Sequence, residues 1–320
     1  MTFRMVLLPP YTEPDWPERI AAAVPGAHIE LFARPEDAAD AIVTADAAYG
    51  TVPPELFARA TRLRWIAAPL AGLGPDWFHP ALVDSDVVVT NMAGIYNEHL
   101  AGHAVGFLLA FSRRFDVYLP RQMLERRWKR SRVDMIDLAS SSVLVVGVGG
   151  SGTEAGRLCK AFGMRVVGVD PRTPSAPADF DLLVRPDQLD AELGRADFVI
   201  VTTPETPATR GLFDAGRFAA MKPGSYLVNI ARGACVVTDD LVDALRSGHL
   251  AGAGLDVVDP EPLPDDHPLF SLPGVLMTPH VAIAGAPGWY ERRTAILVEN
   301  CRRFAAGDEL VNRVDKTQWF

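Results

Sequence analysis

The segment from Val143 to Asp170 constrains the fold more than any other part of the chain. It reads VLVVGVGGSGTEAGRLCKAFGMRVVGVD, so an apolar run meets a cluster of glycines, a helical pattern follows, and a second apolar run ends on an acidic residue. Gly147, Gly149 and Gly152 have the spacing GxGxxG. Because a turn of this kind lets phosphates approach the backbone N–H groups at a helix N-terminus, the pattern predicts a dinucleotide-binding βαβ unit.

The glycines of this turn have separate tasks. Gly147 allows the tight turn, Gly149 admits a pyrophosphate close to the backbone, and Gly152 lets the helix lie near the strand. Gly150 and Ser151 open the helix and are expected in the same phosphate-binding site.

Asp170 bears on the choice of cofactor. It ends the second strand, 18 residues after Gly152. A carboxylate there can accept both hydroxyls of the adenosine ribose and would repel a 2′-phosphate, so NAD is favoured. Arg172 leaves NADP possible, because a guanidinium two residues further on could pair with that phosphate.

Composition excludes several other classes of protein. The chain has 320 residues, enough for two domains, and its 48% hydrophobic and 22% charged residues are typical of globular proteins. The formal net charge of −9 argues against nucleic acid as a partner. No apolar run is long enough to span a membrane, and the N-terminal sequence lacks the pattern of a signal peptide.

Cysteines and histidines give no sign of a metal site. Cys159, Cys235 and Cys301 are far apart and form no CxxC, and the seven His form no cluster at ligand spacing. Such cysteine usage fits a reducing compartment, so we expect a cytoplasmic protein.

Short apolar runs alternate with helical patterns in two series. The first series has expected strands at Met5–Leu8, Ile29–Phe32, Ala47–Gly50, Leu63–Ala67 and Val87–Thr90, with helices at Asp15–Val24 and Pro54–Ala60. The second has strands at Val143–Val146, Arg165–Val169, Phe198–Thr202, Tyr226–Ile230, Gly252–Asp256 and Val275–Thr278. This alternation predicts an α/β protein with two Rossmann-like, doubly wound parallel sheets.

A long apolar helix from Glu98 to about Leu119 separates the two series. The amphipathic stretch TAILVENCRRFAAG follows the second series and is expected to cross back. We therefore expect a smaller, discontinuous, flavodoxin-like domain of residues 1–98 plus 286–320 and a Rossmann domain of residues 99–285, with hinges near Glu98 and Gly285. The Arg-rich segment RQMLERRWKRSR is interpreted as a solvated helix end and loop with Trp128 as its apolar anchor, the alternative being an anion-binding patch.

Three segments that follow strands of the second series carry polar residues: VNIARGACV with Arg232, GLDVVDPEPLP with Asp256 and Glu261, and MTPHVAIAG with His280. The carboxyl ends of parallel strands meet at one edge of a sheet, so these residues can converge. Arg232 suits a carboxylate, His280 can supply a proton near neutral pH, and Glu261 can orient the imidazole. Each alone could be an ordinary surface or loop residue, but together they suit hydride transfer to a 2-oxo acid.

The chain resembles the D-isomer-specific 2-hydroxyacid dehydrogenase family. The resemblance rests on VGVGGSG, ADFVIVTTPETPATRGLF, MKPGSYLVNIARGACV, LVDALRSGHLAGAGLDVVDPEPLP and HPLFSLPGVLMTPH, and it covers nearly the whole length. It implies an NAD(P)-dependent oxidoreductase that transfers a hydride between nicotinamide and C2 of a small D-2-hydroxy acid or 2-oxo acid. Arg232 would bind the carboxylate, and His280, paired with Glu261, would act as acid and base.

The resemblance also implies further contacts. Asp256 is expected at the nicotinamide with Arg232 and His280. Other residues expected along the cofactor are Thr203, Pro204, Ile230 and Ala231. The run WIAAPLAGLG is similar to the family's carboxylate-binding loop, which places Ala71, Gly72 and Leu73 at the substrate together with Arg232 and His280. The run LRWIAAPLAG further resembles glyoxylate/hydroxypyruvate reductase-like members, and the family implies a homodimer formed through the helix after Glu98.

Two places depart from the family pattern. The helix start reads Ala101-Gly102-His103 where the family has AEH. His103 could reach the cleft, but it is interpreted as a packing or polar contact at the helix start. Gly74 and Pro75 follow the substrate-loop motif where the family usually has Asp.

Two other functions stay open. A formate dehydrogenase of this family would carry Gln at Glu261, so the glutamate argues against that reaction. An NAD-sensing corepressor-like binding protein would keep the three catalytic residues, and turnover would separate it from an enzyme.

Overall fold

The computed structural model describes residues 2–126, 128 and 132–320. The chain divides into two compact units, one formed by Met1–Ile95 with Pro287–Phe320 and the other by Tyr96–Ala286. The first crossing lies three residues earlier than expected (95 against 98), and the second lies one residue later (286 against 285).

The first unit contains a five-stranded parallel sheet in the order β2-β1-β3-β4-β5. Its strands are β1 (Phe3–Leu7), β2 (Ala27–Leu31), β3 (Ala47–Tyr49), β4 (Trp65–Ala67) and β5 (Val88–Thr90). Its helices are α1 (Trp16–Ala23), α2 (Pro54–Phe57), α3 (Pro80–Val83) and α10 (Trp289–Ala306), with short 3₁₀ turns at Pro35–Ala38, Ala41–Thr44 and Pro75–Trp77. This is the strand order of flavodoxin-like domains.

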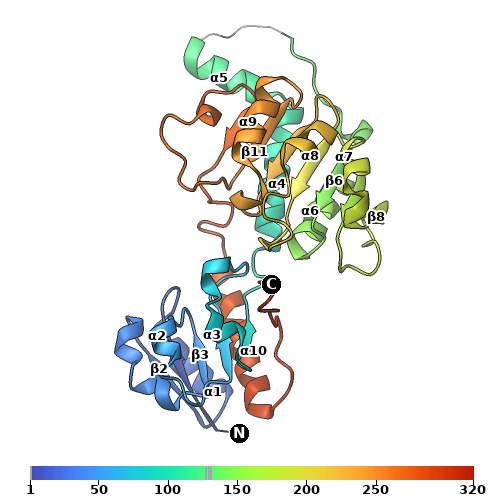
Figure 1. Ribbon diagram of the computed structural model, residues 1–320. Coiled ribbons are helices and arrows are strands. Elements are labelled where there is room, and N and C mark those ends of the chain that lie inside the picture. The colour runs from blue at the N-terminus through green and yellow to red at the C-terminus, as the bar shows by residue number, and fades with distance from the viewer. Residues whose placement is uncertain (1, 127, 129–131) are drawn as a thin grey trace. The chain divides into compact units, whose positions relative to one another are not determined.

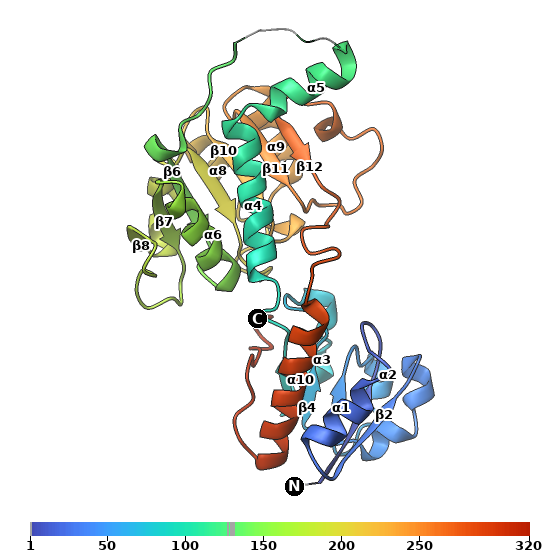
Figure 2. The same cartoon turned by 180° about the vertical axis from the view of Figure 1, so that it is seen from behind.

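Successive side chains of each strand point to opposite faces of this sheet, and each face packs in an apolar layer. Val6, Ile66 and Val89 pack with the residues of α2 and α3 in one core cluster. On the other face, Phe3 contacts Phe304 of α10 with ring centroids 5.2 Å apart. Figure 2 shows α10 lying beside α1, and Trp16 Nε1 of α1 donates a hydrogen bond to Thr294 Oγ1 of α10 at 2.9 Å. The C-terminal helix therefore completes this unit, although it is distant in sequence.

The second unit contains a seven-stranded parallel sheet in the order β12-β11-β10-β9-β6-β7-β8. Its strands are β6 (Ser142–Val146), β7 (Arg165–Val169), β8 (Leu182–Val184), β9 (Phe198–Val201), β10 (Tyr226–Asn229), β11 (Gly252–Leu255) and β12 (Val275–Met277). Read from its other edge, the order β8-β7-β6-β9-β10-β11 is the 3-2-1-4-5-6 order of doubly wound dinucleotide-binding domains, and β12 extends the sheet beyond β11. The prediction of two doubly wound α/β sheets is thus confirmed. β8 was not predicted, because its three apolar residues lie between Asp181 and Arg185 and belong to no longer apolar pattern.

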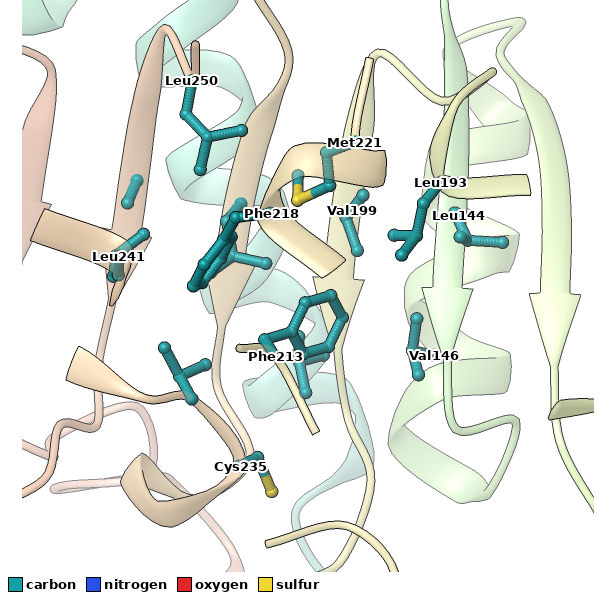
Figure 3. Close-up of a cluster of buried hydrophobic side chains, with 14 of the residues drawn as sticks. Leu144, Val146, Leu193, Val199, Phe213, Phe218, Met221, Cys235, Leu241 and Leu250 are labelled. Atoms are coloured by element: carbon teal, nitrogen blue, oxygen red, sulfur yellow. The ribbon is translucent and has the colours of Figure 1, made fainter. Parts of the chain in front are cut away.

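Helices cover both faces of this sheet (Figures 1 and 2). On one face lie α4 (Asn97–Ser112) and α6 (Gly150–Ala161), and on the other lie α7 (Leu189–Leu193), α8 (Ala215–Ala220) and α9 (Thr238–Arg246). Short 3₁₀ turns occur at Leu138–Ser140, Pro186–Gln188, Gly233–Cys235 and Pro268–Phe270. Figure 3 shows the second layer, where Phe213, Phe218 and Leu241 pack together against the strands. Because both faces are buried, the strands are apolar throughout.

The helix expected from Glu98 to about Leu119 is interrupted. α4 ends at Ser112, and α5 (Phe115–Glu125) begins after Arg114, whose φ of 60° is in the left-handed region. Arg114 Nη1 donates to the hydroxyl of Tyr226 at 2.8 Å, and Nη2 lies 3.2 Å from Asp116 Oδ2. These contacts fix the break, and apolar composition alone could not reveal it.

The interpretation of Trp128 as an apolar anchor is wrong, because its side chain is 98% exposed. Arg127, Lys129, Arg130 and Ser131 of the same Arg-rich segment lie outside the described residues. Among the residues that the structure does describe, no helix is both long and apolar enough to cross a membrane.

Candidate active site

The glycine turn between β6 and α6 forms a cradle with the shape that a pyrophosphate needs. Gly147 has a φ of +98°, and a Cβ there would lie 2.8 Å from the backbone nitrogen of Thr203. A Cβ on Gly152 would lie 1.9 Å from the carbonyl oxygen of Gly147. In contrast, a Cβ on Gly149 would meet no atom within 4 Å. The turn is closed where helix and strand meet and open at the N-terminus of α6, so it fits a dinucleotide.

Two residues that the sequence did not single out support this cradle. Ser151 Oγ donates to Asn97 Oδ1 at 3.3 Å, and a Cβ on Gly150 would lie 2.3 Å from Asn97 Nδ2. Thr202 Oγ1 donates to the carbonyl oxygen of Gly147 at 2.5 Å. Asn97 lies 54 positions before Ser151 in the sequence, so no local pattern could connect the two.

Asp170 ends β7 and braces the glycine turn with its carboxylate. Oδ2 accepts the backbone N–H of Val148 at 2.9 Å, and Oδ1 accepts those of Arg172 and Thr173 at 2.7 and 2.8 Å. Burial acts to raise the pKa of Asp170, but these three donors outweigh it and lower the pKa. The group is therefore ionised at neutral pH, and a negative charge lies beside the turn. Arg185 Nη1 donates to the carbonyl oxygens of Asp170 and Pro171 and holds the same segment.

Arg232 follows β10 on a turn held by a buried asparagine. Asn229 Oδ1 accepts the N–H of Ala231, and its Nδ2 donates to the carbonyl oxygen of Arg232, both at 3.0 Å. Burial lowers the pKa of Arg232, whereas Cys235, Glu205 and Glu261 act in the opposite direction. A guanidinium remains protonated under these conditions and is a desolvated cation well suited to a carboxylate. Asn229 and Glu205 were not identified from the sequence.

The loop of Arg232 lies directly against the loop that carries Glu261. A Cβ on Gly233 would lie 1.8 Å from the carbonyl oxygen of Val258, so only glycine allows this approach. Thr238 Oγ1 also donates to the carbonyl oxygen of Asp259 at 2.5 Å. These contacts join two loops that follow neighbouring strands, β10 and β11.

Glu261 and His280 form a close pair. His280 Nδ1 lies 2.6 Å from Glu261 Oε1, and their side chains are 47% and 41% exposed. His280 has a φ of 53°, in the left-handed region. Such a conformation costs a residue other than glycine about 1–3 kcal/mol, so other contacts must hold it.

Asp256 supplies those contacts. Its Oδ1 accepts the hydroxyl of Thr278 at 2.7 Å and the N–H of Val281 at 2.9 Å, and its Oδ2 accepts the N–H of Ala282 at 3.1 Å. The N–H of His280 donates to the carbonyl oxygen of Asp256 at 2.8 Å. Hydrogen bonds to a charged group contribute about 1.5–3 kcal/mol each, which is enough to offset the strain at His280. Asp256, expected at the nicotinamide, therefore also holds the histidine loop.

The other residues expected along the cofactor follow β9 and β10 at the carboxyl edge of the sheet. They are Thr203, Pro204, Ile230 and Ala231. Thr203 borders the glycine turn, as its close approach to Gly147 shows. Thr209 Oγ1 donates to the carbonyl oxygen of Pro204 at 2.6 Å and fixes the loop after β9.

Ala71, Gly72 and Leu73 lie in the first unit, on the loop after β4, whereas Arg232 and His280 lie in the second. Asn91 Nδ2 donates to the carbonyl oxygen of Ala71 at 2.8 Å and holds this loop. The side chain of Leu73 is buried in the core of its own unit. Only its backbone is left to bind a substrate, as the resemblance implies for this loop.

His103 makes a polar contact, one of the two possibilities expected for it. Its Nε2 lies 2.8 Å from Thr278 Oγ1. Trp289 and Tyr290 of α10 contact residues of the first unit, and the Tyr290 hydroxyl donates to the carboxylate of Asp15. Across residues 2–126, 128 and 132–320, no group of three or more His, Cys, Asp or Glu side chains could hold a metal ion.

Comparison with known proteins shows the family. A model of the D-isomer specific 2-hydroxyacid dehydrogenase NAD-binding domain matches residues 105–282. The chain belongs to the D-isomer-specific 2-hydroxyacid dehydrogenase family and carries its NAD-binding domain, which confirms the resemblance.

Its relatives differ in length and in name. D-3-phosphoglycerate dehydrogenase from Mycobacterium tuberculosis H37Rv is 37% identical over 286 residues, which are 89% of this chain and 52% of the relative. The chain thus spans about half the length of the mycobacterial enzymes. Glyoxylate/hydroxypyruvate reductase A from Serratia proteamaculans is 30% identical over 289 residues, 87% of this chain and 88% of the relative.

Solved structures agree with this assignment. A D-isomer specific 2-hydroxyacid dehydrogenase from Xanthobacter autotrophicus Py2, in complex with NADPH and MES, has a TM-score of 0.84 and 30% identity over 99% of both chains. An NADPH-dependent glyoxylate/hydroxypyruvate reductase from Sinorhizobium meliloti, in complex with NADP and sulfate, has a TM-score of 0.84 and 27% identity over 100% of both chains.

The geometry of the glycine turn gives the first testable prediction. Gly152→Ala forces a methyl group to within 1.9 Å of the Gly147 carbonyl oxygen, so the turn must shift. We expect the Kd for NADH, measured by fluorescence titration, to rise at least about tenfold, since the N–H groups no longer converge on the phosphates. Gly102→Ala on α4 is the matched control, because a Cβ there meets no atom within 4 Å. Equal NADH affinity in the two variants would refute this role of Gly152.

Proposed function

We propose that the chain is an NAD(P)-dependent oxidoreductase that transfers a hydride between nicotinamide and C2 of a small 2-oxo or D-2-hydroxy acid. The observation that carries the proposal is the His280–Glu261 pair, with Nδ1 and Oε1 2.6 Å apart. The pair belongs to the same unit as the glycine turn and Arg232, and all three follow parallel strands at the carboxyl edge of one sheet.

Each catalytic side chain has one role. Arg232 binds the substrate carboxylate. When bound, the reduced cofactor supplies a hydride to the carbonyl carbon. His280 uses Nδ1 for Glu261, so Nε2 gives a proton to the carbonyl oxygen as negative charge develops there. In the reverse direction, Nε2 takes the proton from the hydroxyl group.

Glu261 determines what His280 can do. A carboxylate on Nδ1 fixes the tautomer that carries a proton on that nitrogen and stabilises the imidazolium. This arrangement serves a reaction that moves a proton on or off a substrate oxygen. Formate oxidation needs no such proton, so the Glu261–His280 pair favours a hydroxy acid dehydrogenase.

The substrate we propose is a small, unphosphorylated 2-oxo acid such as glyoxylate or hydroxypyruvate. The segment Ala71–Asp76 reads AGLGPD and contains no Lys or Arg for a phosphate group. Two relatives named above are glyoxylate/hydroxypyruvate reductases, one similar in length and one similar in fold.

The decisive experiment measures the loss of NADH and NADPH absorbance with glyoxylate, hydroxypyruvate, pyruvate, phenylpyruvate and phosphohydroxypyruvate. Turnover of an unphosphorylated acid supports the proposal. Turnover of phosphohydroxypyruvate alone would refute the substrate class. Silence with intact NADH binding would instead favour an NAD-sensing binding protein.

Substitution of His280 and Arg232 separates proton transfer from substrate binding. His280→Ala should lower kcat by about 100-fold or more, with NADH affinity retained, because the proton donor is lost. Arg232→Ala should raise KM for the 2-oxo acid strongly and also lower kcat, because its charge acts in both ground and transition states. Unchanged steady-state kinetics in either variant would contradict the role assigned to that residue.

We propose that NAD is the preferred cofactor. Asp170 keeps a negative charge at the end of β7, where it would repel the 2′-phosphate of NADP. The backbone of Arg172 is part of the same turn, and a guanidinium there lessens the discrimination. NADP therefore remains a usable second cofactor.

Asp170→Asn tests this preference. We expect the ratio of kcat/KM for NADPH to that for NADH to rise by about tenfold, because the amide no longer repels phosphate. Asp181→Asn is the control, since Asp181 also accepts a backbone N–H, from Val166, but lies near the start of β7 rather than at its end. An unchanged ratio in Asp170→Asn would remove this residue from cofactor selection.

We also propose that the protein is a cytoplasmic homodimer formed through the helical region after Glu98, with the contact at α5. Three apolar side chains on one face of this helix are 48%, 47% and 75% exposed: Phe115, Leu119 and Met123. Leu124 beside them is 84% exposed. Apolar groups at this spacing on one helix are typical of an interface rather than of a solvated surface. The cytoplasmic location rests on the three free, buried cysteines.

Light scattering after size exclusion measures the assembly. The native protein should have twice the 34.7 kDa of one chain. Leu124→Glu should shift it toward the monomer, because burying an unpaired charge in an interface is costly. Gln122→Glu adds the same charge at a polar position of α5 and should leave the dimer intact. A native monomer, or a dimer that survives Leu124→Glu, would contradict the proposed interface.

A further inference from the structure

A chain of three polar side chains leads from helix α4 to the loop that carries His280. His103 Nε2 lies 2.8 Å from Thr278 Oγ1, and Thr278 Oγ1 donates to Asp256 Oδ1 at 2.7 Å. His103 Nε2 lies 3.6 Å from the same carboxylate oxygen. The ring of His103 packs edge-on against Phe107, with centroids 5.0 Å apart, which limits its rotation.

The directions of these hydrogen bonds follow from the chemistry of the groups. A buried carboxylate accepts hydrogen bonds, and the single hydrogen of the Thr278 hydroxyl points to Asp256. The threonine oxygen can then only accept from His103, so Nε2 of His103 must carry a hydrogen. His103 is a donor whose acceptor is the hydroxyl group that Asp256 also binds.

We call these three side chains, His103, Thr278 and Asp256, the relay. At its Asp256 end the relay contacts the backbone around His280. The carboxylate of Asp256 accepts the N–H groups of Val281 and Ala282, and its carbonyl oxygen accepts the N–H of His280. These bonds oppose the strain of the left-handed conformation at His280. Any change in the orientation of the Asp256 carboxylate would therefore move the imidazole relative to Glu261.

The relay also connects two segments that are far apart in sequence. α4 begins just after the first crossing between the units, which follows Ile95. Val281 and Ala282 lie shortly before the second crossing, which follows Ala286. Within the second unit, the helix that follows the first crossing and the loop that precedes the second are thus both linked by hydrogen bonds to the Asp256 carboxylate.

We propose that His103 is a positioning residue for the catalytic histidine. By donating to Thr278 it aligns the threonine hydroxyl on Asp256, and Asp256 in turn holds the loop of His280. His103 itself touches neither substrate nor reacting atoms in this role. The inference rests on the proposed function, because it assigns acid–base chemistry to His280.

The test compares His103→Phe, which removes the donor, with His103→Gln, whose amide nitrogen can replace Nε2. We expect His103→Phe to lower kcat by about tenfold, while KM for the 2-oxo acid stays within about twofold, because a hydrogen bond that aligns the proton donor is lost. His103→Gln should recover most of kcat. His249→Phe is the matched control. His249 Nε2 forms a hydrogen bond with the carbonyl oxygen of Met221, and both residues precede strands, at the amino ends of the sheet.

Hydrogen exchange of residues 278–282, followed by mass spectrometry, gives a readout that needs no turnover. Exchange should be faster in His103→Phe and near native in His103→Gln. If the native protein turns over no 2-oxo acid, the proposed function fails, but this exchange comparison still tests the relay. Unchanged kcat and exchange in His103→Phe, or equal defects in both variants, would overturn the proposal. Thr278→Val removes the same hydroxyl link and repeats the test if His103→Phe does not fold.

Discussion

The active site depends on one buried charge, the carboxylate of Asp256. At 3% exposure this group cannot rely on water, so protein donors must stabilise it. Its donors are the Thr278 hydroxyl and the N–H groups of Val281 and Ala282. The residues on both sides of His280 therefore donate hydrogen bonds to the same Asp256 carboxylate, and this accounts for the left-handed backbone at His280.

The same solution recurs at other loops of the carboxyl edge. Asp170 takes three backbone N–H groups and braces the glycine turn, and Asn229 bridges the turn that carries Arg232. In the first unit, Asn91 holds the carbonyl oxygen of Ala71. Each of these loops is thus held by a polar side chain that lies at or just after the end of a strand. A rigid support of this kind is what the roles proposed for Arg232 and His280 require.

Much of the fold and part of the site could be predicted because their signals are local. The GxGxxG turn, the apolar strands and the residues after them are short patterns whose geometry follows from the backbone. Predictions from apolar composition, in contrast, were wrong where tertiary contacts determine the conformation. The helix that looked continuous is interrupted at Arg114, and Trp128 is exposed to solvent. β8 was missed because its three apolar residues stand between Asp181 and Arg185 without a longer pattern of their own, and pairing with β7 makes them a strand.

The sequence by itself determined two doubly wound sheets, a dinucleotide turn, and the placing of Arg232, Glu261 and His280 after neighbouring strands. The tertiary structure decided which side chains support them: Asn97 at Ser151, and His103 at Thr278, 175 positions away along the chain. Backbone periodicity and turn chemistry are properties of adjacent residues and can be read along the chain. A hydrogen bond between distant residues depends on where the packed helices and strands bring them, and only the folded chain specifies that.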